Sequence, residues 1–274
     1  MVALRWSTLV VLLLVVSACT SGRHPAQRPS ASASVSAPTT PLPSGPQSTV
    51  GATPALPSQS RSAPEAAPKV PPVSAQARAA GLVDIRTVVP DAVIDLRYAT
   101  SDNFTHVQLY PSDARCLVHQ TMVAGLATAA SRLRRAGYMM VFWDCYRPHA
   151  VQVRMFKIVP DPEWVARPGP LATSHEAGRS VDITLARTST GSGCPVARRV
   201  GSYCTVDMGT GFDDFTSRAY AYATSGVSAV AQSNRSVLRS AMSAGGLAAY
   251  SSEWWHFDGA GAGVGRPHLN AAVN

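Results

Sequence analysis

The sequence lacks several features that would assign it to a common class of protein. The apolar run Leu9–Val16 is well short of the roughly 20 residues that a transmembrane helix needs. No run of basic residues is interleaved with aromatic residues, so the net charge of +8 does not indicate a nucleic-acid-binding protein. Such a charge would instead favour anionic lipid or acidic cell-wall polymer. No Cys-x-x-Cys pair is present, which argues against a zinc site built from cysteines, and there is no internal repeat.

The first residues have the layout of an export signal. Arg5 precedes the apolar run, which ends in Val16-Ser17-Ala18-Cys19, a stretch that resembles the lipobox of bacterial lipoproteins. We therefore expect residues 1–18 to be a lipoprotein signal peptide and Cys19 to be the lipidated first residue of the mature protein. A diacylated cysteine would anchor the protein to the outer face of the bacterial cytoplasmic membrane. The alternative is simple cleavage after Ala18, with Cys19 left unmodified.

The segment that follows, residues 19–80, is rich in Ser, Pro, Ala and Thr and has almost no large apolar residues. It cannot bury enough apolar surface to offset the entropy cost of ordering, so we predict a disordered tether. Residues 81–274 then have a length suited to one folded domain rather than two. The tether would hold this domain away from the membrane.

The domain contains four cysteines, an even number that predicts disulfides in an exported protein. Four cysteines allow three pairings. Cys194 and Cys204 are close in the sequence and would close a short loop, and we favour this pair. Cys116 and Cys145 would then form the second bridge.

The apolar pattern of the domain mixes strands and helices without a regular β-α-β alternation, which predicts an α+β fold with an antiparallel sheet. The clearest helix carries apolar residues at spacings of three and four and ends at Gly137. One or two short strands, broken at Pro90, are expected over residues 83–98, and further strands over 138–143, 180–185 and 254–258. Helices are expected over 120–136, from just after Pro148 to about 158, and over 235–244.

Two distant stretches bring together the residue types of a metal site. The first runs from Thr173 to Thr184 and contains His175 and Asp182; the second is Ser252-Glu253-Trp254-Trp255-His256-Phe257. A catalytic zinc ion takes three nitrogen or oxygen ligands and keeps one position open for water. His175, Asp182 and His256 can supply the three ligands, which leaves Glu253 as a general base for the water. This pattern predicts a zinc peptidase.

The spacing of these residues limits how they can be held. Side chains alternate along a strand, so only even offsets share a face, whereas both the offset from His175 to Asp182 and that from Glu253 to His256 are odd. Gly178 can adopt backbone angles that other residues avoid, so we expect a loop between His175 and the strand that carries Asp182. We expect Glu253 at a bend or bulge just before the strand that carries His256.

These motifs resemble those of the D-alanyl-D-alanine dipeptidases, zinc enzymes related to D,D-carboxypeptidases and to the hedgehog-type fold. The resemblance covers Leu82 to Asp258 in order and implies one α+β domain with a central, mostly antiparallel sheet, flanking helices and one zinc ion. Besides the two metal stretches it rests on several further motifs, namely Asp95-Leu96-Arg97-Tyr98 with the residues up to Thr105, Trp143-Asp144-Cys145-Tyr146-Arg147-Pro148, Met208-Gly209-Thr210-Gly211-Phe212-Asp213 and Asn234-Arg235-Ser236-Val237-Leu238-Arg239.

The resemblance also implies roles for residues outside the metal set. Arg147 would stabilise the oxyanion of the tetrahedral intermediate, although a surface ion pair with Asp144 is the alternative from sequence alone. Asp213 would receive the free ammonium group of the substrate. Three hydroxyl residues would lie near the bound dipeptide. These are Tyr98, Thr173 and Ser174.

The expected reaction is zinc-dependent hydrolysis of D-alanyl-D-alanine to two D-alanine molecules, by metal-activated water with Glu253 as base. One alternative is a D,D-carboxypeptidase that trims peptidoglycan stem peptides, and another is a non-catalytic wall-binding lipoprotein. The carboxypeptidase would need an open groove where a dipeptidase has an ammonium-binding carboxylate. Trp254 and Trp255 are predicted to pack the core. The histidines outside the motifs are predicted to be surface or packing residues: His106, His119, His149 and His268.

Overall fold

The computed structural model of the protein describes residues 70–188 and 193–274. The expected signal peptide, the lipidation site at Cys19 and the tether up to residue 69 lie outside these residues. In the part of the chain that is described, no helix is both long enough and apolar enough to cross a membrane.

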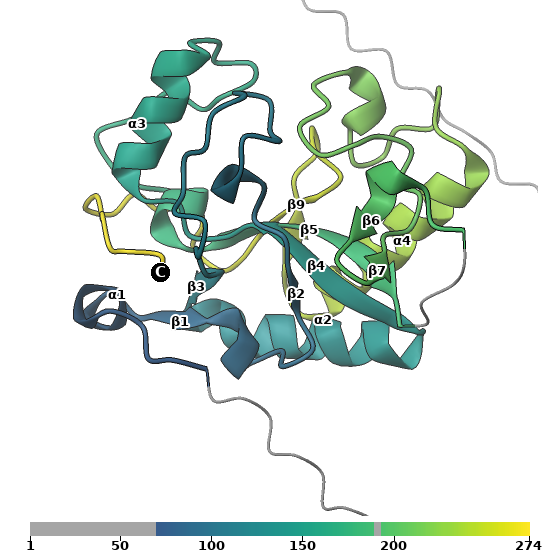
Figure 1. Cartoon of the computed structure of the whole chain (residues 1–274), viewed down its shortest axis with the longest axis horizontal. Helices are drawn as coiled ribbons and strands as arrows, with labels where there is room; N and C mark the ends of the chain where they lie inside the picture. The colour runs from purple at the N-terminus through teal and green to yellow at the C-terminus, as the bar shows by residue number, and fades with distance from the viewer. Residues whose placement is uncertain (1–69, 189–192) are drawn as a thin grey trace, which may run out of the picture. The chain divides into compact units, whose positions relative to one another are not determined.

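The domain is built on a five-stranded sheet with the strand order β2-β4-β5-β9-β8 (Figure 1). Strand β2 pairs with β4 in parallel, and the other three pairs are antiparallel. The predicted α+β fold with a mostly antiparallel central sheet is therefore confirmed. The strands of this sheet are β2 (Val93–Ile94), β4 (Tyr138–Asp144), β5 (Ser180–Arg187), β8 (Ala248–Ala249) and β9 (His256–Asp258).

Two long helices, α2 (Val123–Arg135) and α4 (Ala229–Ala244), form part of the main hydrophobic core. Helix α2 contacts both β4 and α4 and lies below the sheet in Figure 1. The two helices approach so closely that a Cβ atom on Gly125 would lie 2.3 Å from the carbonyl oxygen of Gly245. Glycine at this contact removes the side chain that would otherwise hold the helices apart.

Helix α3 (His149–Ile158) lies on the other side of the sheet from α2 (Figure 1). It begins after Pro148, as the sequence predicts. The remaining elements are short: helix α1 (Ala75–Ala79), the paired strands β1 (Leu82–Asp84) and β3 (Leu117–His119), the hairpin β6 (Arg199–Val200) and β7 (Tyr203–Cys204), and 3₁₀ turns at Ile85–Thr87, Arg97–Ala99, Gln120–Met122, Ser174–Ala177 (η4), Val196–Arg198 and Ser217–Ala219.

The boundaries of several elements differ from those expected. Helix α1 lies inside the segment predicted to be a disordered tether: Ser74 caps it, and Ala77 is fully buried in a small cluster that includes Tyr146. Helix α4 begins six residues earlier than expected, because the side chain of Ser228 accepts a hydrogen bond from the backbone of Ala231. Strand β9 starts at His256 rather than at residue 254.

The structure joins Cys116 to Cys145 and Cys194 to Cys204, the two pairs favoured from the sequence. The first bridge is buried and connects the start of β3 to the residue that follows β4. The second closes the β6–β7 hairpin near the surface. The two bridges therefore constrain different parts of the fold.

Candidate active site

The register of three neighbouring strands aligns acidic and imidazole side chains in a row. Asp144 at the end of β4 is paired with Asp182 of β5, and Asp182 is paired with His256 of β9. Residues directly opposite each other on paired strands lie on the same face of the sheet. The alternate residues Val181 and Phe257 point to the opposite face, into the hydrophobic core. At this end of the three strands, one face of the sheet therefore carries the row of polar side chains and the other face packs against the hydrophobic core.

His175 reaches this row from outside the sheet. It lies in η4, which ends at Gly178 with a left-handed φ of 63°. This glycine reverses the chain into β5, as expected from the odd offset between His175 and Asp182. The His175 ring is buried, and its Nδ1 lies 2.8 Å from the carbonyl oxygen of Cys145.

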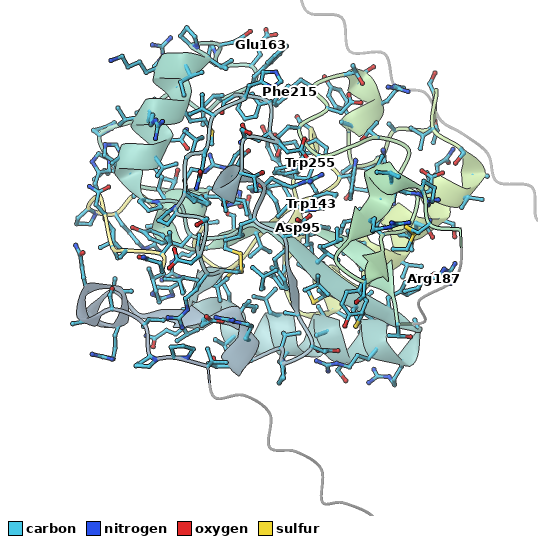
Figure 2. The ribbon with its side chains drawn as sticks, in the orientation of Figure 1. Asp95, Trp143, Glu163, Arg187, Phe215 and Trp255 are labelled. Carbon is cyan, nitrogen blue, oxygen red and sulfur yellow. A yellow bond between two sulfur atoms is a disulfide. The ribbon has the colours of Figure 1, made fainter. Side chains whose placement is uncertain are left out.

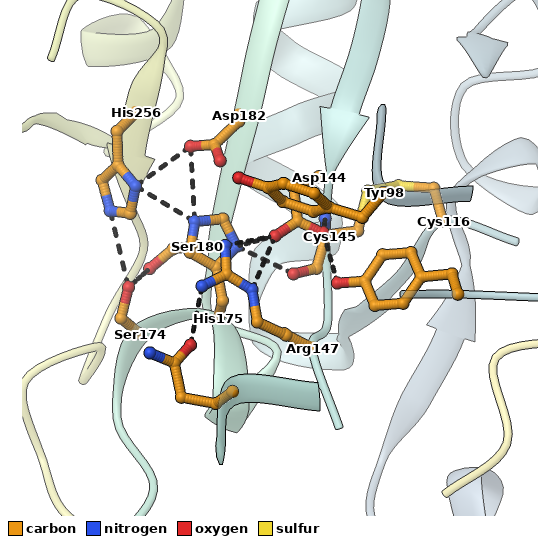
Figure 3. Close-up of polar contacts among 12 residues, drawn as sticks. Tyr98, Cys116, Asp144, Cys145, Arg147, Ser174, His175, Ser180, Asp182 and His256 are labelled. Carbon is orange, nitrogen blue, oxygen red and sulfur yellow. Dashed lines mark hydrogen bonds and ion pairs between the residues drawn. A yellow bond between two sulfur atoms is a disulfide. The ribbon is translucent and has the colours of Figure 1, made fainter. Parts of the chain in front are cut away.

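Three donor atoms form a compact triangle at this point (Figure 3). His256 Nδ1 lies 3.0 Å from Asp182 Oδ1, His175 Nε2 lies 3.3 Å from the same oxygen, and the two nitrogens are 3.1 Å apart. Four ligands around a tetrahedral ion with bonds of about 2.0–2.1 Å are separated by roughly 3.3 Å. All three residues are buried, so the triangle has the size of a metal site.

The hydrogen bonds around the triangle set the direction of each lone pair. His175 Nδ1 lies next to the backbone carbonyl oxygen of Cys145, which can only accept a hydrogen bond. The ring therefore carries a proton on Nδ1, which leaves the lone pair on Nε2. His256 has Nε2 3.0 Å from Asp258 Oδ1, which leaves the lone pair on Nδ1. When both imidazoles are neutral, their two lone pairs and a carboxylate oxygen converge without a hydrogen among them. This donor set fits a cation such as Zn²⁺.

Without a metal ion, a proton takes the place of the cation. Burial by itself would lower the pKa of His256, but the carboxylates of Asp182 and Asp258 outweigh it and raise this pKa to about 10. Burial pushes the pKa of Asp182 up, and the two imidazoles more than reverse this, so that it falls below the ordinary value. At neutral pH a metal-free site therefore holds His256 as an imidazolium.

Glu253 lies beside the triangle but outside it. Its Oε2 is 3.8 Å from His256 Nδ1, longer than the sides of the triangle, and it precedes the bend at Trp254 and Trp255 that leads into β9. Burial raises the pKa of Glu253, and Asp182 contributes to the rise. The carboxylate is therefore placed to accept a proton from a molecule at the open side of the triangle.

Arg147 and Asp144 form a buried pair rather than the surface pair that the sequence left open. Arg147 Nη2 donates to Asp144 Oδ2 at 2.6 Å, and Asp144 is fully buried. Asp144 also accepts a 2.6 Å hydrogen bond from the hydroxyl of Tyr110, and Arg147 Nη1 donates to Gln152. Burial lowers the pKa of Arg147, but Asp144 outweighs it and keeps the guanidinium charged. The charge of Arg147 is therefore fixed in place beside the triangle.

The three residues of the triangle, Glu253 and Arg147 line a cavity of about 320 Å³. Tyr98, Ser174 and Asp213 also line it, and the hydroxyl of Tyr98 donates to Asp213 at 3.2 Å. Burial raises the pKa of Asp213 well above its ordinary value, and Asp182 and Glu253 raise it further. Asp213 has a strained φ of 55°, a feature that gathers at functional sites.

Thr173 is the one expected substrate residue that does not line the cavity. It is exposed and precedes η4, whereas its neighbour Ser174 faces the cavity with a φ of 48°. The Ser174 hydroxyl donates to Ser180 at 2.8 Å and lies 3.5 Å from His256 Nε2. Of the two hydroxyls, the structure places only that of Ser174 near the triangle.

Sequence reasoning missed two kinds of residue at this site. Asp258, which orients His256, is two positions further along β9, so the alternation of side chains along a strand was a usable signal. Aromatic residues that form the outer part of the cavity come from separate loops and carried no such signal. Trp164 stacks on Phe215 with ring centroids 4.6 Å apart, and Phe215 meets Phe104 edge-on at 5.2 Å. Phe215 lies well away from α2, across the sheet (Figure 2).

A second cluster also combines two histidines with one carboxylate. His149 Nδ1 lies 2.6 Å from Glu176 Oε1, and the ring of His268 stacks on that of His149 at 3.5 Å and 7°. Ring nitrogens hold a metal through lone pairs in the ring plane, and those of stacked parallel rings do not converge. The geometry of this cluster is that of packing residues, the role predicted for His149 and His268.

Comparison with known proteins places the chain in a family. The family described as D-Ala-D-Ala dipeptidase, a group of metallopeptidases, matches residues 78–274. The D-alanyl-D-alanine dipeptidase of Escherichia coli (strain K12) is 37% identical over 65% of this chain and 83% of its own length. The enzymes of that name from Enterococcus faecium and Streptomyces coelicolor are 31% and 30% identical, each over 60% of this chain and 83% of its own length. The chain is thus a metallopeptidase, and it belongs to the D-Ala-D-Ala dipeptidase family.

Proposed function

We propose that the protein hydrolyses D-alanyl-D-alanine to two D-alanine molecules and that one Zn²⁺ per chain is held by His175, Asp182 and His256. The observation that carries the proposal is the triangle of converging donors, with Glu253 and Arg147 on the same cavity. The relatives named above are dipeptidases for this substrate. A bound zinc ion would polarise the scissile carbonyl and make water more acidic.

The residues around the triangle would carry the proton and the developing charge. Glu253 takes a proton from the attacking water and returns it to the leaving amine. Arg147 faces the oxyanion with a charge that Asp144 has already oriented, so little reorganisation is needed in the transition state. Asp258 and the carbonyl of Cys145 keep each imidazole in one tautomer.

The far end of the cavity supports a short substrate. Asp213 is a carboxylate that accepts a hydrogen bond from Tyr98, and burial, together with the nearby anions Asp182 and Glu253, raises its pKa; a substrate ammonium group would supply the missing positive charge. The cavity volume of about 320 Å³ is near the lower end of the range for small-molecule sites. Both features favour a dipeptidase over a D,D-carboxypeptidase, which has to admit a peptide stem.

One assay separates these two activities. The purified protein is incubated with D-alanyl-D-alanine and, in parallel, with a pentapeptide that ends in D-Ala-D-Ala, and released D-alanine is measured. We expect release from the dipeptide alone. Release from the pentapeptide at a similar rate would mean that the protein is a D,D-carboxypeptidase and not a dipeptidase. Release from neither substrate would favour a wall-binding protein without activity.

We further propose that the protein is exported and anchored by a lipid on Cys19, so that it acts on the outer face of the membrane. The two disulfides support an oxidising compartment. There the enzyme would meet peptides released from peptidoglycan rather than a cytoplasmic precursor. Fractionation of cells tests this: the wild type should partition with membranes and Cys19→Ala should not. An unmodified Cys19 in a soluble secreted protein would disprove the anchor.

A further inference from the structure

The Cys116–Cys145 disulfide lies against the candidate active site. Cys145 directly follows Asp144 and is two residues before Arg147 (Figure 3). Both halves of the bridge are at most 1% exposed. The bridge is therefore buried next to residues of the candidate site and does not lie on the surface.

The backbone of Cys145 serves both halves of the site. Its carbonyl oxygen accepts the Nδ1–H of His175 at 2.8 Å, which directs His175 Nε2 into the triangle. Its N–H donates to Asp144 Oδ1 at 2.9 Å, and Asp144 Oδ2 holds Arg147. The N–H of Arg147 in turn donates to the carbonyl oxygen of His175 at 3.0 Å. A shift of Cys145 would thus move an expected metal ligand and the expected oxyanion residue together.

This backbone lacks the support that regular structure gives. The pairing of β4 with β5 is irregular between Phe142 and Asp144, and residues 145–148 belong to no helix or strand. The run is tied to β3 by one backbone hydrogen bond, from Tyr146 N–H to the carbonyl oxygen of Leu117 at 2.8 Å. The disulfide adds a covalent tie at the adjacent residue, from Cys145 to Cys116, which directly precedes β3.

We propose that the Cys116–Cys145 bridge is a positioning element of the metal site: it fixes the carbonyl that orients His175 and the segment from which Arg147 projects. The inference rests on the proposed function, because it takes His175 as a metal ligand. Outer groups that orient metal ligands typically contribute 10–100-fold to metal affinity or activity.

The second disulfide provides a matched control. Cys194 and Cys204 close a loop in the β6–β7 hairpin, and neither is among the described residues that line the active-site cavity. The experiment compares the full-length wild type with Cys116→Ala/Cys145→Ala and with Cys194→Ala/Cys204→Ala. Zinc affinity is measured by competition with a chromogenic chelator, and kcat and KM are measured on D-alanyl-D-alanine at a temperature at which all three proteins are folded.

We expect loss of the Cys116–Cys145 bridge to weaken zinc binding by roughly 10–100-fold and to lower kcat more than it changes KM. The control should keep both quantities within about twofold of the wild type, even if its Tm falls. Equal zinc affinity in both double variants would overturn the positioning role. A wild type that binds no zinc would instead overturn the proposed function, so the two failures are distinguishable.

A second measurement tests the proposal even if the Cys116→Ala/Cys145→Ala variant does not fold. The Cys194→Ala/Cys204→Ala variant, folded and loaded with zinc, is treated with a phosphine. The phosphine reduces the remaining Cys116–Cys145 disulfide to two thiols and is itself oxidised to its oxide, with the oxygen coming from water. Alkylation and mass spectrometry identify opened Cys116 and Cys145. We expect zinc to dissociate at least about tenfold faster from the reduced protein; an unchanged rate would contradict the proposal.

Discussion

Among the residues that the structure describes, two clusters each place two histidines beside one carboxylate, and the two clusters have adjacent residues in the sequence. One contains His175 and the other Glu176, which is the next residue. In the first, hydrogen bonds to outer groups turn the lone pairs inward; in the second, the rings of His149 and His268 stack face to face. If the proposed function holds, the difference means that the direction of the donors, which the surrounding residues set, decides which cluster binds metal, and that residue type and proximity alone do not.

The strongest test of this comparison removes one histidine from the triangle. His256→Ala opens the ligand set, so zinc content should fall from about one ion per chain to near zero and activity should be lost. Elemental analysis of the purified protein and the D-alanine assay measure both. Zinc retained at the wild-type level would mean that the ion is held elsewhere, and the second cluster would be the first place to look.

The next largest effect distinguishes metal binding from catalysis. Glu253→Gln keeps the shape of the side chain and all three ligands but removes the expected base. Zinc content should stay the same while kcat falls by roughly 10²–10⁴-fold. Loss of zinc in this variant, with retention in His256→Ala, would require the two residues to exchange roles.

Arg147→Ala should also leave zinc in place. It removes a fixed positive charge beside the triangle, so kcat should fall by roughly 10²–10³-fold, which is the cost of losing one oxyanion donor. Because Asp144 would lose its partner, thermal unfolding must be followed as well, to identify a variant that is merely unfolded. An unchanged kcat in a folded variant would mean that Arg147 has only a structural role, as the ion-pair partner of Asp144.

A smaller effect is the pH dependence of zinc binding. In the metal-free protein Asp182 and Asp258 outweigh burial and raise the pKa of His256 to about 10, so the imidazole carries an extra proton at neutral pH. Zinc has to displace that proton, and its affinity should rise roughly tenfold per pH unit between about pH 6 and 8. Calorimetry in two buffers of different ionisation enthalpy should show about one proton released per zinc. Release of none would show that the site is already deprotonated.

The smallest expected effect is in the second cluster. His268→Ala removes a stacked ring from a partly exposed site, so stability should fall by no more than about 1 kcal/mol and zinc content and kcat should not change. Denaturant unfolding and elemental analysis test this. A fall in bound zinc from two ions to one would show that the stacked rings separate and bind metal after all.

The sequence predicted the parts of this site that follow from strand alternation and turn chemistry. The odd offset from His175 to Asp182 and the position of Gly178 were enough to predict the turn before β5. The same reasoning placed Glu253 before the strand of His256. The start of β9 was wrong because the apolar pair Trp254-Trp255 resembles a strand, whereas the N–H of Trp254 donates to the carbonyl oxygen of Ala219, outside the sheet.

Burial from distant segments could not be predicted. Whether Asp144 and Arg147 meet at the surface or inside depends on Tyr110 and Gln152, and no local pattern connects these residues. The extent of the tether was overestimated for the opposite reason, since helix α1 is only five residues long and its Pro- and Ala-rich surroundings hide it. Its order depends on packing in a cluster with Tyr146.

The pairing of β5 with β9 has a consequence for genetic variation. Asp182 is paired with His256, and Val181 is paired with Phe257, so a polar pair and an apolar pair follow each other at adjacent positions along the strands. A substitution changes one side chain, but an in-frame insertion or deletion of one codon within either strand would shift every later residue to the other face. A change ahead of Asp182 in β5, for example, would turn Asp182 towards the core and bring an apolar residue into the site. Within these strands, one-codon insertions and deletions should therefore inactivate the enzyme far more uniformly than missense changes do.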